Sequence, residues 1–427
     1  MMRLAVIFES SPFDRKGLVN AVHNRVKHLL ATGECAIDVF CVHSRDNAFT
    51  RRVRHTPEVP SVDETVVDGI RYRLLWYRFS ILDNLLLEKL HVRPWLFRRF
   101  MASHMDLLKG YDAVIAHSFC GGLFALAAHE RFGVPYYVTW HGSDVHTHPW
   151  RVPVILEDTR AVMESARCNF FVSRALLEAS ERIISDARKE VLYNGVSEDF
   201  VKYSPEERAA VRERYGLAPE DKVVAFVGNI VTVKNVLSLP EIFAQVASRF
   251  AEVSGSLSDS CGRSARLKFW IVGDGKLRAQ LETACSESLT RHCEDRSPSR
   301  HCEERTPLRH CEERSDVAIS FFGNQPSPAM PDIMNCIDVL VLPSLNEGLP
   351  LVCAEALSCG AAVVGSDVGG IAEVIGSENV VPLGNSFVNG MAEKVVAALV
   401  GQSPSQTLPS DISWARTAKR ELSFLKS

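Results

Sequence analysis

The chain has 427 residues, of which 46% are hydrophobic and 23% charged, and its formal net charge is −4. This composition is that of a globular protein, and the length predicts two domains because a single core rarely serves so many residues. The slightly negative net charge argues against a protein that binds polyanions, so we expect no nucleic-acid partner. Local basic patches are still compatible with this net charge.

The N-terminal run MMRLAVIFESSPFD contains a short apolar segment that stops at Glu9, which is too short for the core of a secretory signal. No stretch reaches 18 uninterrupted apolar residues, so the sequence predicts no membrane-spanning helix. Twelve cysteines without a secretory signal indicate reduced thiols rather than a disulfide framework. We therefore expect a cytoplasmic protein.

Short β-branched runs alternate with longer helical stretches along both halves of the chain. The first half contains the runs RLAVIF (3–8), AIDVFCV (36–42), DAVIAH (112–117), YYVTWH (136–141) and NFFVS (169–173). The second half repeats this rhythm with KVVAFVG, KFWIVG, AISFFG, DVLVLP and AAVVGS. Strands that are apolar throughout are typical of parallel sheets covered on both faces by crossover helices. The pattern predicts two doubly wound α/β domains, joined in the polar stretch around 194–210.

Glycines and polar residues follow five of these expected strands, at the sheet edge where doubly wound folds bind ligands. The junctions are HGSD at 141–144, Gly228-Asn229, Gly273-Asp274-Gly275, Gly323-Asn324 and SLNEG at 344–348. Glycine lets a backbone approach a ligand closely, and the helix N-termini that follow favour anions. Glycines end strands in many α/β proteins, but five such junctions together indicate a nucleotide or cofactor site of unspecified kind.

The most informative segment is PSLNEGLPLVCAEALSCGAAVVGSDVGGIAEVI, at 343–375. Glu347 follows the expected strand, and Glu355 lies eight positions later on a helix that begins near Pro350. The N–H groups around 348–351 are expected to face an anion. Two carboxylates beside an anion site suit a sugar nucleotide, while a surface helix with two solvated glutamates is the plainer alternative.

This segment resembles the signature of the retaining glycosyltransferases of the GT-B fold, the large glycosyltransferase family four. The resemblance extends to FVGNIVTVKN (226–235) and IVGDGKLRAQL (271–281), and more loosely to HGSD (141–144), VSRALLE (172–178) and VLYNGVSEDF (191–200). It implies two Rossmann-like domains facing across a cleft. We expect an acceptor-side domain at 1–200, a donor domain at 201–410, and a helix at 411–427 that packs back toward the N-terminal domain.

Carried over position by position, the resemblance implies a role for each matching residue. Glu347 is expected to contact the donor sugar near the reacting carbon, Glu355 to hold the ribose, and His141 to lie across the cleft near sugar and acceptor. A histidine that follows a strand is also often only a hydrogen-bonded loop residue. The diphosphate would be bound by Lys234 and by backbone groups of Gly17, Gly228, Asn229, Gly348, Leu349, Pro350 and Leu351.

Asn229 departs from the family pattern, because many members have an arginine directly after the strand glycine. Phosphate binding would then depend more on Lys234, on the helix N-terminus, or on a further basic residue such as Lys276. The resemblance also implies retention of anomeric configuration by front-side displacement, with a nucleotide-diphosphate sugar as donor and neither metal nor other cofactor. No carboxylate in the sequence is identified as a covalent nucleophile.

Two other functions are weighed against this one. A Rossmann-type oxidoreductase requires G-x-G-x-x-G after a strand, and neither GNIVTVK nor GDGKLR provides it. A catalytically impaired relic of a glycosyltransferase is the second alternative, because repeats interrupt the expected donor domain.

The repeat RHCEDRSPSRHCEERTPLRHCEERSDVAIS carries Arg-His-Cys at 291, 300 and 309. Adjacent His and Cys side chains point to opposite faces of an extended strand, and the spacing does not fit the usual zinc patterns. The unit resembles translated palindromic repeat elements, so we interpret about 287–316 as an inert insertion whose cysteines are exposed and oxidisable. A second, smaller insertion is expected within 253–268.

The segment 71–100 holds six arginines, two tryptophans and many leucines. An amphipathic segment of this kind can lie in a membrane interface, which predicts peripheral contact with the inner face of the membrane. The alternative is an ordinary helix pair that packs its leucines inward. The expected partners are therefore a nucleotide sugar, a lipid-linked or polysaccharide acceptor for cell-surface glycan assembly, and this membrane surface.

Overall fold

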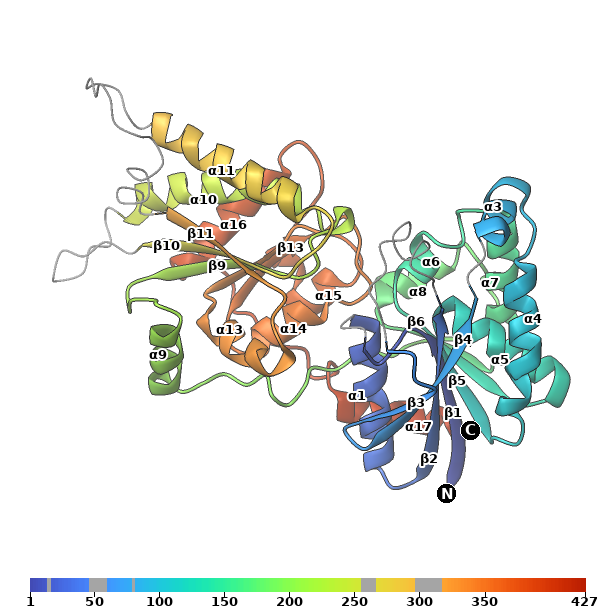
Figure 1. Ribbon diagram of the computed structural model, residues 1–427. Helices are drawn as coiled ribbons and strands as arrows, with labels where there is room; N and C mark the ends of the chain where they lie inside the picture. The colour runs from blue at the N-terminus through green and yellow to red at the C-terminus, as the bar shows by residue number, and fades with distance from the viewer. Residues whose placement is uncertain (14–16, 46–59, 79–80, 255–265, 296–316) are drawn as a thin grey trace. The chain divides into compact units, whose positions relative to one another are not determined.

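The computed structural model describes residues 1–13, 17–45, 60–78, 81–254, 266–295 and 317–427. The chain forms two compact units, one of Met1–Gly195 with Ser410–Ser427 and the other of Val196–Pro409 (Figure 1). Most of the repeat segment and of the expected smaller insertion at 253–268 lies outside the described residues. Each unit has its own sheet and core, which confirms the prediction of two doubly wound α/β domains.

Unit 1 is built on an eight-stranded sheet in the order β3-β4-β2-β1-β5-β6-β7-β8. The strands pair in parallel, except for the antiparallel hairpin of β3 and β4 at one edge. That hairpin was not predicted, and it takes up the first part of the segment 71–100. The bounds are β1 Met2–Glu9, β2 Cys35–Ser44, β3 Glu64–Val67, β4 Ile70–Tyr77, β5 Ala113–His117, β6 Tyr136–Trp140, β7 Cys168–Phe171 and β8 Lys189–Val191.

Helices cover this sheet, and the last one comes from the far end of the chain. The helix α17, Trp414–Leu425, packs against α1, Gly17–Ala31, and places Ala418 and Leu422 in the same core as β1 and β2. The other helices of the unit are α3 Ile81–Leu90, α4 Trp95–His104, α5 Ser118–Phe132, α6 Ser143–His146, α7 Pro153–Ser165 and α8 Arg174–Ser180.

Unit 2 has a six-stranded parallel sheet in the order β11-β10-β9-β12-β13-β14. Its strands are β9 Lys222–Val227, β10 Leu267–Val272, β11 Val317–Gly323, β12 Val339–Leu342, β13 Ala362–Ser366 and β14 Val380–Val381. Its helices are α9 Pro205–Arg214, α10 Leu239–Ser254, α11 Arg278–Asp295, α13 Met330–Cys336, α14 Leu351–Ser358, α15 Ile371–Ile375 and α16 Phe387–Leu399. The strand order reverses between β9 and β12, which places a switch point, and hence a ligand edge, at their carboxyl ends.

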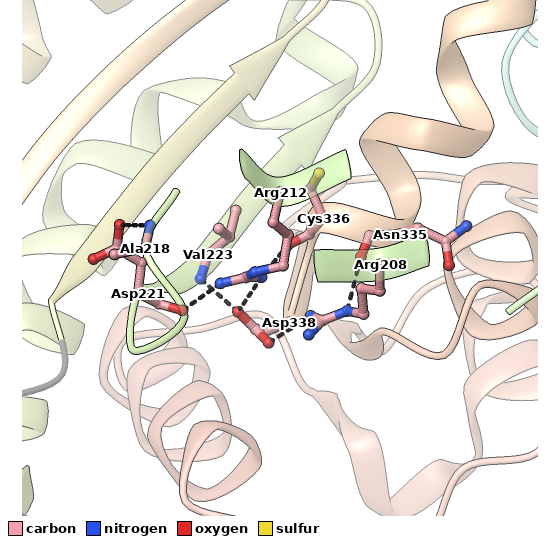
Figure 2. A network of polar contacts seen from close by, with 8 residues as sticks. All are labelled: Arg208, Arg212, Ala218, Asp221, Val223, Asn335, Cys336 and Asp338. Carbon is pink, nitrogen blue, oxygen red and sulfur yellow. Dashed lines mark hydrogen bonds and ion pairs between the residues drawn. The ribbon is translucent and has the colours of Figure 1, made fainter. Parts of the chain in front are cut away.

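A polar network fastens α9 to the opposite, amino edge of the same two strands (Figure 2). The Asp338 carboxylate accepts hydrogen bonds from Arg208 at 2.9 Å, from Arg212 at 3.3 Å and from the Val223 amide at 2.8 Å. The buried Arg212 also donates to the Cys336 carbonyl at 2.6 Å. Because this network lies where β9 and β12 begin, it stabilises the unit without entering the ligand edge.

None of the helices within the described ranges combines the length and apolar character that crossing a membrane requires.

Candidate functional site

Glu347 occupies the loop that leaves β12, and two side chains hold its carboxylate. The Lys234 ammonium and the Ser344 hydroxyl both donate to Oε1, at 2.5 and 2.6 Å. Lys234 comes from the short turn after β9, and its neighbour Val233 accepts a backbone hydrogen bond from Leu345 at 2.8 Å. The carboxylate is therefore fixed at the carboxyl edge of the two central strands, with its side chain 11% exposed.

The glutamate loop lies directly against the loop that follows β13. A Cβ on Gly369 would come within 1.9 Å of the Glu347 carbonyl oxygen, and Gly369 has φ +53°. The Gly370 amide donates to the Gly348 carbonyl at 3.0 Å. The glycine at 369 therefore has a structural reason, since any side chain there would displace the loop that carries the glutamate.

Free backbone donors lie beside this carboxylate. The helix α14 begins at Leu351, directly after Pro350. Proline is tolerated at a helix start because the first N–H groups of a helix have no hydrogen-bond partner within it. Among the described residues, no carbonyl or side-chain oxygen accepts a hydrogen bond from the amides of Gly348 and Leu349. Amides without partners at a helix N-terminus attract anions, because the helix dipole adds to their own polarity.

Glu355 lies on α14, half-buried, one helical turn beyond the first residues of that helix. Burial raises the pKa of its carboxyl to about 7, and no cation or hydrogen-bond donor among the described residues offsets the loss of water. Burial likewise raises the pKa of the neighbouring Cys353 thiol, which therefore stays protonated and packs as an apolar side chain. The two glutamates thus have different environments, one held by a cation and one poorly solvated.

The glycine turns after β9 and β10 pack against each other. A Cβ on Gly273 would lie 2.0 Å from the Gly228 carbonyl oxygen, and a Cβ on Gly275 would lie 2.3 Å from the Ile230 carbonyl oxygen. Packing therefore explains Gly273 and Gly275 without a ligand. Gly228 has φ +152°, and Asn229 after it is exposed, as is Lys276.

In unit 1 the site residue His141 follows β6 and pairs with a second histidine. The His117 Nδ1 and His141 Nε2 atoms are 3.0 Å apart, so one ring donates and the other accepts. Burial lowers the pKa of His141 to about 3, with a further contribution from the nearby Arg25 cation. Burial, His141 and Arg25 also lower the pKa of His117. Both rings are therefore neutral at physiological pH.

The loop after His141 is shaped by Asp144, which the sequence analysis quoted only as part of HGSD. Its buried carboxylate accepts from the Gly142 amide at 2.8 Å and from the His141 amide at 3.1 Å. Gly142 has φ +151°, a conformation that side chains rarely allow. Ser118, the first residue of α5, also hydrogen-bonds this carboxylate and has φ +61°. Strained non-glycine backbone of this kind is concentrated at functional sites.

Beneath the histidines lies a buried ion pair that sequence patterns did not reveal. Arg25 of α1 donates to the Thr139 hydroxyl at 2.7 Å, and its Nε is 3.0 Å from a carboxylate oxygen of Glu421 in α17. The two charged side chains are 1% and 0% exposed. Burial lowers the pKa of Arg25 and raises that of Glu421, while the attraction between them works against both shifts.

The remaining predicted residue of unit 1 is Gly17, the exposed first residue of α1. A Cβ there would meet no atom within 4 Å, so packing within the unit does not require glycine at this position. The residues that precede it in the expected phosphate loop, 14–16, lie outside the described part of the chain.

The structure thus brings Lys234, Glu347, Gly348 and the start of α14 together at one sheet edge of unit 2. His141 and Gly17 belong to unit 1. In the part of the chain that the structure describes, no three His, Cys, Asp or Glu side chains are placed to hold a metal ion. The sequence placed Ser344 at the ligand edge, within SLNEG, without giving it a role. It did not point to His117 or Arg25, although His117 ends a predicted strand and the ligand-edge rule could have found it.

Comparison with known proteins matches both halves to families. Residues 221–400 match the family Glycosyl transferases group 1, and residues 16–195 match the Glycosyl transferase 4-like domain. The 2-deoxystreptamine glucosyltransferase of Streptomyces kanamyceticus is 28% identical over 276 residues, which are 60% of this chain and 60% of that protein. The N-acetyl-alpha-D-glucosaminyl L-malate synthase of Bacillus anthracis is 24% identical over 273 residues, 64% of this chain and 59% of that protein. The alignments therefore span about 60% of the length of these curated relatives.

Solved structures match the whole chain at low identity. The sucrose-phosphate synthase of Thermosynechococcus elongatus superposes with a TM-score of 0.66 and 18% identity, covering 100% of this chain and 94% of that one. HepE of Anabaena, solved with UDP-glucose, superposes with a TM-score of 0.61 and 16% identity, covering 99% of this chain and 95% of that one. WaaG, described as a glycosyltransferase involved in lipopolysaccharide biosynthesis, gives 0.59 and 16%, also covering 99% and 95%. These matches show the fold.

Proposed function

Since the chain belongs to the glycosyltransferases and has the GT-B fold, we propose that it transfers a sugar from a nucleotide-diphosphate donor to a lipid-linked or polysaccharide acceptor, with retention of configuration. The observation that carries the proposal is the pairing of Lys234 with Glu347 beside the unpartnered amides of Gly348 and Leu349. One anion site next to two carboxylates suits a ligand that carries phosphates and hydroxyls together.

In this proposal unit 2 binds the donor. The Lys234 ammonium has three N–H donors, so it can hold Glu347 and a phosphate oxygen at the same time. The amides of Gly348 and Leu349 and the N-terminus of α14 bind the diphosphate, with Gly228 and Asn229 alongside. Glu347 then contacts the sugar near the reacting carbon, and Glu355 accepts hydrogen bonds from the ribose hydroxyls.

The bond that breaks is the one between the anomeric carbon of the sugar and the diphosphate oxygen. Negative charge grows on the leaving diphosphate, so donors already fixed around it stabilise the transition state more than the ground state. The acceptor hydroxyl oxygen bonds to the anomeric carbon on the same face from which the diphosphate leaves. The departing diphosphate accepts the proton of that hydroxyl. Neutral His141 is assigned to the acceptor side and Gly17, at the start of α1, to the phosphate side, and no metal is assigned a role.

The proposal places the enzyme in the cytoplasm and, through 71–100, at the inner face of the membrane. The exposed leucines of α3, at 82, 85 and 90, support that contact. Leu87 of the same helix packs inward against Val152 and Ile155, so inward packing accounts for only part of the helix. Cell-surface glycan assembly is the process that fits such an acceptor.

The test is donor binding by isothermal titration calorimetry with UDP, GDP and ADP and their common sugars. One nucleotide should bind, and Glu355→Ala should weaken it while Glu241→Ala, an exposed glutamate of α10, leaves it unchanged. No binding of any nucleotide by the folded protein would refute the donor site. With the donor identified, the configuration of the product, read by NMR, then tests retention.

A further inference from the structure

The helices α3 and α4 of unit 1 form an outer layer against α5 and α7, and this layer is poorly packed (Figure 1). No residue of either helix is buried, although both are described in full. Leu82, Leu90 and Trp95 are 64%, 66% and 62% exposed. Apolar side chains gathered in this way on one surface mark a site of interaction.

Polar and aromatic contacts hold this layer at its margins rather than along its length. Arg93, between the two helices, pairs with Asp158 at 2.8 Å and with Glu157 at 3.1 Å on α7. At the other margin Phe97 and Phe100 of α4 pack edge-on against Phe124 of α5. The layer is therefore anchored to the unit, while the space beneath it is left unfilled.

That space is a cavity of about 850 Å³, within the range of small-molecule sites. Its walls are mainly apolar and include Leu87, Phe97, Met101, Leu123, Leu126 and Ile155. Glu9, Tyr77 and Cys120 line it as well, and these follow or end β1, β4 and β5 at the carboxyl edge of the sheet. The cavity therefore extends from the ligand edge of unit 1 outward beneath the exposed helices.

The charged residues that line the cavity are four arginines and four carboxylates, and two of the arginines are available to bind an anion. Arg78 and Arg98 are exposed, and among the described residues neither forms an ion pair with a carboxylate. Three of the four acidic lining residues have partners: Glu9 accepts from the Tyr77 hydroxyl at 3.2 Å, Asp83 accepts from the Leu96 amide at 2.8 Å, and Asp158 pairs with Arg93 at 2.8 Å.

We propose that this cavity binds the hydrocarbon chain of an anionic lipid, with the lipid phosphate held by Arg78 and Arg98. The apolar walls of the cavity suit the hydrocarbon chain, and the two arginines suit the phosphate. The cavity reaches the carboxyl edge of the sheet at Glu9, Tyr77 and Cys120. The role of this lipid rests on the proposed function: if the protein is a glycosyltransferase, its acceptor is a phosphate-linked lipid and not a free polysaccharide.

The test measures binding of alkyl phosphates to the whole protein by calorimetry, below their critical micelle concentration and without any nucleotide. Octyl, decyl and dodecyl phosphate should bind about fourfold more tightly per added methylene, as expected for a chain entering an apolar cavity. Ala127→Phe, which fills the cavity from α5, should abolish that dependence. Ala209→Phe, the same change at an exposed position of α9, should leave it intact.

Charge is tested separately. The double change Arg78→Ala and Arg98→Ala should weaken dodecyl phosphate by roughly tenfold and leave dodecanol unaffected. Inorganic phosphate alone should bind far more weakly than dodecyl phosphate. No binding, or a chain-length dependence that persists in Ala127→Phe, would overturn the proposal. Because the assay contains no donor, it can fail while nucleotide binding succeeds, and the reverse also holds.

Discussion

Glu355 offers a sharp test of the donor site, because removing its carboxylate should stabilise the fold and at the same time weaken nucleotide binding. The substitution Glu355→Gln keeps the size of the side chain and removes only the ionisable group. Burial raises the pKa of this carboxyl from 4.5 to about 7, so the folded protein disfavours its ionised form. We therefore expect Glu355→Gln to stabilise the protein at alkaline pH while it weakens nucleotide binding.

The magnitude follows from the shift in pKa between the unfolded and the folded chain. A carboxyl whose pKa is raised by folding destabilises the folded state by nothing below its unfolded pKa. The cost grows as pH rises from the unfolded pKa to the folded pKa and is constant above it. The shift, from 4.5 to about 7, corresponds to roughly 3 kcal/mol once the carboxyl is ionised in both states. At pH 8 the variant should gain about that much, which is roughly 6–10 °C in unfolding midpoint. At pH 5 the gain should fall below about 1 kcal/mol.

Thermal unfolding of the ligand-free protein between pH 5 and pH 8 measures this gain. Glu241→Gln, at an exposed position of α10, serves as the matched control and should show no pH-dependent gain. Calorimetry at pH 8 should show weaker nucleotide binding by Glu355→Gln in the same preparation. If Glu355→Gln is less stable than the unmodified protein at pH 8, or gains equal stability at pH 5 and pH 8, then burial of the ionised Glu355 carboxylate does not destabilise the fold.

Three further predictions concern other parts of the structure. Lys234→Met removes the cation that holds Glu347 and should weaken nucleotide binding by roughly tenfold to a hundredfold in calorimetry, whereas unchanged binding would place the phosphates elsewhere. Asp338→Asn breaks the network around buried Arg212 and should lower the free energy of unfolding by roughly 3 kcal/mol in urea titrations, with nucleotide affinity unchanged. His141, whose pKa is lowered to about 3, should remain neutral at pH 5, and nitrogen NMR shifts that titrate between pH 6 and pH 7 would contradict this.

The fold could be predicted from the sequence because it depends on local patterns, and the donor site stays a prediction whose residues in unit 2 the structure brings to one sheet edge. Apolar runs between helical stretches predicted the parallel strands, and the spacing from Glu347 to Glu355 predicted a loop followed by a helix start. The contact of Lys234 with Glu347 joins residues 113 positions apart, and no local pattern contains it. The resemblance implied a sugar contact for Glu347 and a phosphate contact for Lys234, and the structure adds that the Ser344 hydroxyl also donates to the Glu347 carboxylate.

Other features could not be predicted because they depend on burial, which a charged residue does not reveal in sequence. Arg25 has the spacing of an ordinary charged residue on a helix, yet it is buried against Glu421 near the end of the chain. The arginine-rich segment 71–100 suggested one amphipathic element, whereas its first part pairs as β4 with β2. The oxidoreductase alternative ended with the family matches, and the glycines at 273 and 275 proved to have a packing role.

The return of α17 to unit 1 has a consequence for the order in which the nascent chain can fold. Residues 196–409 form a complete unit and are synthesised before Ser410–Ser427, so unit 2 can fold while unit 1 still lacks a helix. Until Glu421 emerges from the ribosome, the Arg25 guanidinium has no carboxylate to neutralise it in the apolar interior that α1 faces. Unit 1 therefore begins before unit 2 in the chain but is completed only after it, when α17 docks against α1.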